Sequence, residues 1–109
     1  MDLVDVVYSL TERFPPAEDY RLTSQVLRAV VSVPANIAEG QVRLTVKDFA
    51  NFLSIAKGSL METETLLTIA LRRNYLSEVE AARAFGLITE ISKMLTALRT
   101  RIGFDRRSS

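Results

Sequence analysis

Apolar residues recur at intervals of three and four along most of the chain, which is the spacing of amphipathic helices. The pattern predicts four helices, at about residues 2–14, 20–40, 45–73 and 78–102. Pro15-Pro16 ends the first helix, because the residue before a proline is disfavoured in the helical region. Gly103 is the expected cap of the last helix, and residues 104–109 are expected to fray beyond it.

Three of the predicted helix starts carry capping signals. Asp19 and Thr23 are candidate caps of the second helix. Thr45-x-x-Asp48 resembles a capping box before the third helix, and Ser77-x-x-Glu80 forms one before the fourth. Short apolar runs such as residues 30–33 resemble strands in isolation, but the period around them is helical. Four helices with short links predict an all-α fold, an up-down-up-down antiparallel four-helix bundle that fills one domain over residues 1–109.

The second and third predicted helices are apolar over more of their circumference than one core requires. A stripe of roughly 100° is enough to face a single core. A chain of 109 residues has room for one core only. The additional apolar surface therefore predicts that the chain associates with copies of itself.

Pro34 interrupts the second predicted helix and is expected to kink or break it, at a cost of about 3 kcal/mol in a helix interior. The chain is expected to turn between the second and third helices near residues 40–44. A residue of the second helix should then lie at the same height along the bundle as a residue of the third when their numbers sum to about 90. Ser32 is then expected beside Gly58, whose missing side chain would let the two backbones approach.

Polar residues around this step predict a structural network rather than a ligand site. Arg28 is expected to be largely buried and to pair with the carboxylate of Glu62 or Glu64. Glu62 and Glu64 diverge by about 200° on a helix, which makes them a poor acid and base couple. Three further polar residues are expected to supply hydrogen-bond donors and acceptors around Pro34: Ser32, Asn36 and Glu39. The second helix is expected to end at Gly40.

Composition excludes several classes of chemistry. The chain has no cysteine and no histidine, so a disulfide framework, a thiolate metal site, a nucleophilic triad and a histidine base are all ruled out. Acidic residues stand where a signal peptide would be basic, and no apolar run reaches membrane-spanning length, which predicts a cytoplasmic protein. A net charge of +1 makes no general demand for nucleic acid, and the basic last segment is also typical of a solvated helix end.

A set of ordered motifs is specific enough to indicate a family. The motifs are Phe14-Pro15, then Tyr20-x-Leu22-x-x-Gln25-x-x-Arg28-Ala29-x-x-Ser32-x-Pro34-x-Asn36-Ile37-Ala38-Glu39-Gly40, and Phe52-Leu53-x-Ile55-Ala56-x-Gly58-Ser59-Leu60-x-Glu62-x-Glu64-Thr65. Over about residues 8–102 the chain closely resembles the four-helix bundle proteins called 23S rRNA intervening sequence proteins. The resemblance implies a bacterial, ring-like homopentamer, with relatives among the accessory proteins of diversity-generating retroelements, which bind reverse transcriptase and nucleic acid through a basic surface.

Together these features predict a non-enzymatic, pentameric module that binds RNA or a nucleic-acid–protein complex, without cofactor, metal, membrane or small-molecule substrate. The alternative is an adaptor that binds only a protein partner, with basic residues that serve solubility. An enzyme is disfavoured because no spacing of carboxylates, lysines, serines or tyrosines supports a catalytic site. The candidate contacts to nucleic acid are six basic residues: Arg43, Lys47, Arg72, Arg73, Arg99 and Arg101.

Overall fold

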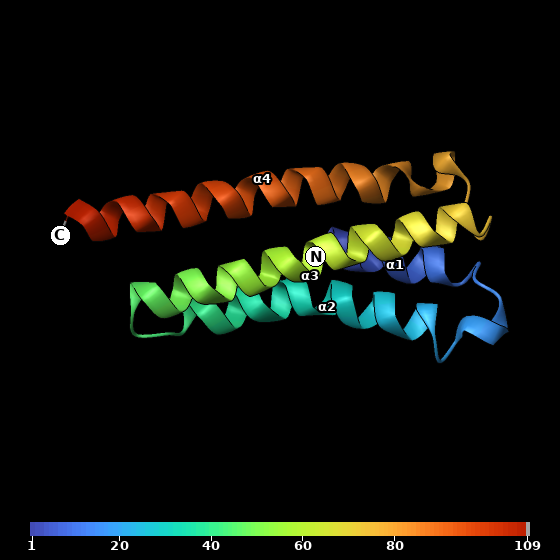
Figure 1. Ribbon diagram of the computed structural model, residues 1–109, viewed down its shortest axis with the longest axis horizontal. Coiled ribbons are helices and arrows are strands. Elements are labelled where there is room, and N and C mark those ends of the chain that lie inside the picture. Colours follow the sequence, from blue (N-terminus) through green and yellow to red (C-terminus); the bar gives the residue numbers. More distant parts are fainter. Residues whose placement is uncertain (109) are drawn as a thin grey trace.

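The computed structural model describes the backbone of residues 1–108 and the side chains of residues 1–103. The elements are α1 (Asp2–Thr11), a short 3-10 helix η1 (Pro16–Glu18), α2 (Leu22–Gln41), α3 (Val46–Arg72) and α4 (Glu78–Ser108). Consecutive α-helices run in opposite directions along the long axis (Figure 1). The predicted up-down-up-down four-helix bundle is therefore confirmed.

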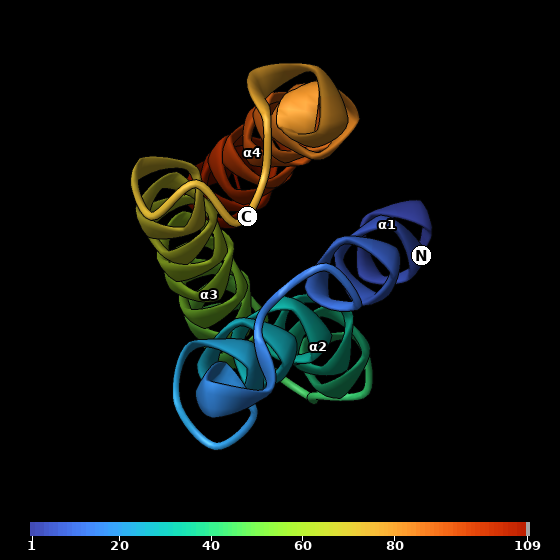
Figure 2. The same cartoon turned by 90° about the vertical axis from the view of Figure 1, so that its right-hand side faces the viewer.

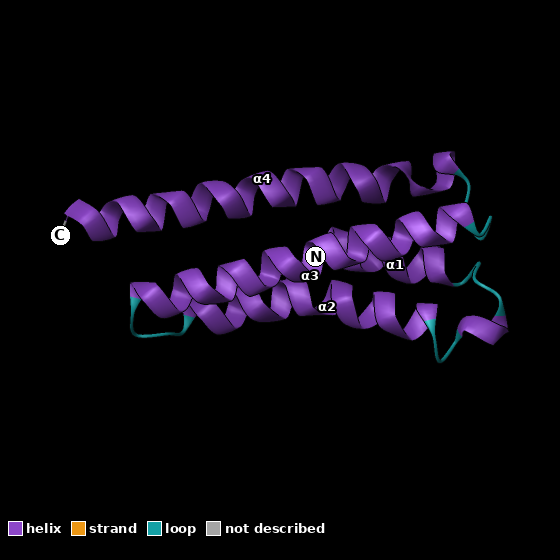
Figure 3. Cartoon of the chain, viewed as in Figure 1, coloured by secondary structure: helices purple, strands orange, loops and turns teal. Residues whose placement is uncertain are grey.

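The helices are arranged around the bundle axis in chain order, as the end-on view in Figure 2 shows. Helix α2 packs against both α1 and α3, and α4 packs against both α1 and α3. The pair formed by α2 and α3 makes the most extensive contact. Short loops connect these helices (Figure 3), so each helix lies beside its neighbour in sequence.

Aliphatic side chains from every helix fill the core. Val7 of α1, Val30 of α2, Leu60 of α3 and Ile88 of α4 are each completely buried. Each belongs to a stripe of apolar residues at helical spacing, which is why these segments form helices and face inward. None of the helices in the described part of the chain combines the length and hydropathy needed to cross a bilayer.

Helix α1 is much shorter than its partners. Its 10 residues span about 15 Å, whereas α4 continues for 31 residues. Helix α1 starts midway along the bundle (Figure 1). An apolar groove lined by Ile37, Ile91, Met94 and Leu98 therefore opens between α2 and α4, next to Met1. A cross-section of the bundle therefore contains four helices at one end and three helices at the other.

Helix α2 continues through Pro34 without interruption, so the predicted break is wrong. Polar groups beside the proline stabilise this turn. Asn36 Nδ2 donates to both the carbonyl oxygen and the hydroxyl of Ser32, each over 2.8 Å. The Ser32 hydroxyl also lies 2.8 Å from the Ser59 hydroxyl on α3. The pair confirms the predicted register of the two helices, since the residue numbers sum to 91.

The close approach of α2 to α3 occurs at Gly40 and not at Gly58. A Cβ atom built at Gly40 would lie 2.9 Å from Phe49 Cδ1 and from Phe52 Cβ, which is far inside van der Waals contact. One built at Gly58 would meet nothing within 4 Å. The prediction for Gly58 is wrong because Ser59, its neighbour, faces α2, and adjacent helical residues point about 100° apart.

Two predicted charge contacts are also wrong. Arg28 is exposed and its guanidinium lies 3.4 Å from Ser24 Oγ, although Arg28 and Glu62 do line one polar groove. Within the described side chains, Arg28 makes no ion pair with Glu62 or Glu64. An exposed guanidinium on the helix surface is well hydrated and needs no carboxylate. Glu39, expected to supply an acceptor near Pro34, pairs instead with Arg43 one turn later.

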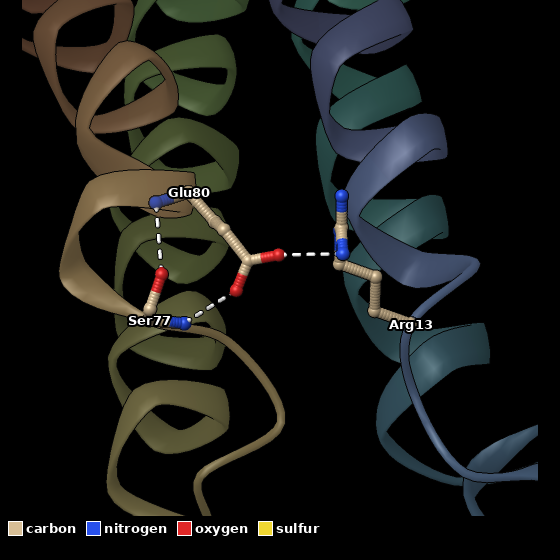
Figure 4. Close-up of polar contacts among 3 residues, drawn as sticks. All are labelled: Arg13, Ser77 and Glu80. Atoms are coloured by element: carbon tan, nitrogen blue, oxygen red, sulfur yellow. Dashed lines mark hydrogen bonds and ion pairs between the residues drawn. The ribbon is translucent and has the colours of Figure 1, made fainter.

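The expected helix caps are present at two starts. Thr45 Oγ1 accepts a bond from the Asp48 amide over 3.1 Å at the start of α3. At α4, Ser77 and Glu80 each receive the other's backbone N–H, at 3.1 and 2.9 Å, and Arg13 pairs with Glu80 at 2.7 Å (Figure 4). The Ser77 amide and hydroxyl, with a smaller contribution from Arg13, lower the pKa of Glu80. The stabilisation contributed by the Glu80 carboxylate is therefore complete at neutral pH and is lost as pH falls through that lowered pKa, whereas the bond from the Glu80 amide to the Ser77 hydroxyl does not titrate.

Helix ends are less well predicted than helix starts. Helix α1 ends at Thr11 rather than at residue 14, because the amides of Arg13 and Phe14 bond three residues back and tighten the chain before the prolines. The predicted end of α2 at Gly40 is correct to within one residue, since α2 ends at Gln41, whereas Gly103 does not stop α4, which continues to Ser108. The fraying predicted for residues 104–109 is therefore not seen in the backbone of residues 104–108, and Ser109 lies outside the described residues.

Candidate nucleic-acid interface

The six predicted contact residues divide between the two ends of the bundle. Arg43 and Lys47 flank the turn between α2 and α3, and Arg99 and Arg101 lie on the part of α4 that reaches the same end (Figure 1). Arg72 and Arg73 lie at the last residues of α3, at the opposite end. The structure thus places four of the six toward one end of the bundle and two at the other, although Arg99 and Arg101 line different grooves, Arg99 between α3 and α4 and Arg101 between α2 and α4.

Arg43 is held at the turn by two contacts. Its guanidinium pairs with Glu39 one turn earlier on α2. The same group lies over the Phe52 ring of α3, with 4.7 Å between Cζ and the ring centroid. Both Arg43 and the neighbouring Lys47 are exposed, so the turn presents positive charge to solvent.

The two arginines at the far end have different surroundings. The guanidinium of Arg73 lies 5.9 Å from the centroid of Tyr75, and hydrogen bonding to Tyr75 is the main cause that raises the pKa of Arg73. Arg72 lines a shallow groove that also contains the carboxylate of Glu64. Acidic and aromatic neighbours accompany these cations, as Glu39 and Phe52 accompany Arg43, so the two ends do not differ in this respect.

A groove between α3 and α4 contains a basic pair that the sequence did not single out. Arg99 Nε donates to Ser54 Oγ over 2.7 Å, and Lys57 Nζ donates to Thr96 Oγ1 over 2.6 Å. Each bond crosses from one helix to the other. The groove has a volume of about 410 Å³, and Gly58 also lines it.

Lys57 was missed because its place depends on how α3 and α4 are aligned. In the sequence, Lys57 lies next to the stripe of buried residues on α3 and has the pattern of an ordinary surface lysine. The short link before Ser77 could have shown the alignment of the two helices. A turn there places a residue of α3 at the same height as a residue of α4 when their numbers sum to about 152. That register puts Lys57 within one turn of Thr96, as the structure shows.

A family assignment follows from comparison with known proteins. The model of the 23S rRNA-intervening sequence protein family matches residues 1–97. The chain belongs to this family. Lys57 and Thr96 lie inside the matched range of this 23S rRNA-intervening sequence protein, and Arg99 and Arg101 follow it directly.

A solved structure agrees with this assignment. It is the crystal structure of a protein of unknown function from the S23 ribosomal protein family of Bacteroides thetaiotaomicron. It is 28% identical to this 23S rRNA-intervening sequence protein, with a TM-score of 0.77 over 90% of this chain and 88% of that chain. No curated protein matches the chain.

Proposed function

We propose that this 23S rRNA-intervening sequence protein is a non-enzymatic, pentameric module that binds RNA, alone or within an RNA–protein complex. The binding surface is the end of the bundle formed by the α2–α3 turn and the C-terminal part of α4. The observation that carries the proposal is that four basic residues lie toward this end, Arg43, Lys47, Arg99 and Arg101, with Lys57 nearer the middle of α3 in the groove that contains Arg99.

The symmetry of a ring would strengthen the weak positive potential at this end of each copy. The whole chain carries a net charge of only +1, so a single copy attracts RNA weakly. In a ring, each copy repeats the same basic end, and the summed potential at that side rises with the number of copies. The proposal therefore links RNA binding to self-association.

The proposal is tested with a pair of variants that have equal charge. Reversing Arg99 and Arg101 to glutamate is expected to lower the affinity for a labelled structured RNA at least tenfold, as about one phosphate contact is lost per arginine. Reversing Arg72 and Arg73 changes the net charge by the same amount at the opposite end and should have a much smaller effect. The measurement is fluorescence anisotropy at several salt concentrations.

Two outcomes would contradict the proposal. Equal losses in both double variants would show that net charge alone governs binding. Absence of binding by the unmodified protein at low salt would favour an adaptor that binds only a protein partner. In the expected case, the logarithm of affinity falls steeply with the logarithm of salt concentration.

Self-association is supported by apolar residues on the outer face of α3. Ile55 and Ile69 are 43% and 41% exposed and, being fourteen residues apart, lie on the same side of the helix. Exposed aliphatic groups that line one helix face are typical of contacts between subunits. Val31 of α2 is similarly exposed, at 41%.

Replacing Ile55 and Ile69 with aspartate is expected to dissociate the assembly, because a charge buried at a subunit contact is costly. Sedimentation velocity would then show the mass of one 12.2 kDa chain. The matched control places aspartate at Ala82 and Thr89, two exposed positions on α4. Dissociation of the control, or an unchanged mass in the isoleucine variant, would argue against α3 as the contact face.

A further inference from the structure

We propose that the groove between α3 and α4 is a phosphate-binding site in which Lys57 and Arg99 hold one phosphate group from either side. The inference rests on the proposed function in one respect, namely that the RNA backbone supplies the phosphate. The residues that form the site come from two helices and are already in place: Ser54, Lys57, Gly58, Thr96, Arg99 and Thr100.

Both cations keep hydrogen-bond donors for a ligand. An ammonium group has three N–H donors, and the structure uses one of those of Lys57, toward Thr96 Oγ1. Arg99 uses Nε toward Ser54 Oγ, which leaves the two terminal nitrogens of its guanidinium for an anion. Phosphate oxygens accept bonds of this charge-assisted kind, and they are about twice as strong as neutral ones.

Hydroxyl groups position the two cations without neutralising them. The Ser54 hydroxyl donates its hydrogen to the Ala50 carbonyl oxygen over 3.2 Å, so its oxygen is oriented to accept from Arg99. Thr96 Oγ1 accepts a hydrogen bond from Lys57 Nζ. A carboxylate in either place would have cancelled the charge that an anion requires.

The charge of the groove is uncompensated. None of the residues that line it is acidic. The ion pairs among the described side chains, Arg13 with Glu80 and Arg43 with Glu39, lie elsewhere. By contrast, the polar groove between α2 and α3 that holds Arg28 also holds Glu62, which makes it unsuitable for an anion.

Gly58 leaves space for the ligand. A Cβ atom at this position would have no neighbour within 4 Å, so the helix surface between Lys57 and Arg99 is open. The volume of about 410 Å³ exceeds the share of liquid volume of a single water, about 30 Å³, by roughly an order of magnitude. A phosphate group and several waters can therefore enter.

The first test is a titration of the full chain with inorganic phosphate, followed by the amide signals of its four glycines in a two-dimensional nitrogen–proton NMR spectrum. The Gly58 signal is expected to shift in a saturable manner. Gly86, an exposed glycine on α4 outside the groove, serves as the control and should not move. A parallel titration with chloride at equal ionic strength separates phosphate binding from screening.

The second test compares Lys57→Met with Lys93→Met in the RNA anisotropy assay. Each removes one positive charge, but Lys93 is exposed on α4 outside the groove and is not among the proposed RNA contacts. Lys57→Met is expected to weaken RNA binding about tenfold and to reduce the salt dependence by about one phosphate contact, whereas Lys93→Met should change affinity less than about threefold. Gly58→Glu, at an open position, offers a second variant that places a carboxylate in the groove.

The outcomes separate this inference from the proposed function. If RNA binds but Lys57→Met and Lys93→Met weaken it equally and the Gly58 signal stays fixed, the groove is not a phosphate site and RNA contacts the surface elsewhere. If Gly58 responds to phosphate while RNA fails to bind, the groove stands as a site for a small phosphate-bearing ligand and the RNA proposal fails.

Discussion

Replacing Gly40 with alanine is expected to lower the free energy of unfolding by about 1–3 kcal/mol, the range measured for overpacked sites. The new methyl group would lie 2.9 Å from Phe52 Cβ, an atom fixed directly to the backbone of α3. The ring of Phe49 blocks the space at the same distance. Relief requires the two helices to separate at the turn, where they are joined most tightly.

Gly58→Ala is the matched control because it adds the same methyl group to a helix where nothing lies within 4 Å. Its expected effect is opposite in sign, a gain of up to about 1 kcal/mol from the better helix propensity of alanine. Urea unfolding at one fixed protein concentration measures both variants, since self-association would otherwise contribute. A stabilised Gly40→Ala variant would refute the close approach at Gly40.

Leu60→Ala is expected to cost about 2–5 kcal/mol, the range found when a buried leucine is truncated. Leu60 is completely buried near the middle of α3, where the core receives side chains from the other helices. Truncation removes apolar contact and leaves a cavity that rigid neighbouring helices fill only partly. For a domain of this size, the melting temperature should fall by about ten degrees or more.

Leu44→Ala provides the comparison, since it makes the same truncation at a side chain that is 100% exposed in the α2–α3 turn. The stability of the folded chain should change by less than about 0.5 kcal/mol. A large loss at Leu44 together with a lower sedimenting mass would place this turn in a contact between subunits. A small loss at Leu60 would contradict its position in the core.

Much of the fold was predictable because it depends on periodicity and on local signals. Each apolar stripe identified a helix, and the prolines and the Ser77–Glu80 box placed two boundaries to within a few residues. Short links then determined that neighbouring helices are antiparallel. Helix stops were harder to predict, because a glycine permits a helix end without requiring one: α2 ends one residue beyond Gly40, but α4 continues past Gly103.

The candidate interface was less predictable because it depends on side-chain direction. A register error of a single residue turns a helical side chain by about 100°, which is the difference between Gly58 facing α2 and Gly58 lining the α3–α4 groove. Lys57 is placed by the same geometry. The sequence also could not show that hydration would suffice for Arg28, since periodicity does not distinguish a half-exposed cation from a buried one.

The short length of α1 makes the two ends of the molecule mechanically unequal. Where all four helices overlap, opening one helix exposes core from several sides, whereas the end beyond Met1 is held by α2, α3 and α4 alone. Local opening costs least where packing partners are fewest. The basic turn therefore lies at the end that opens more easily, and the phosphate groove extends toward it from the level of Met1. Side chains of α4 can adjust there to an irregular ligand while the opposite end keeps the chain folded.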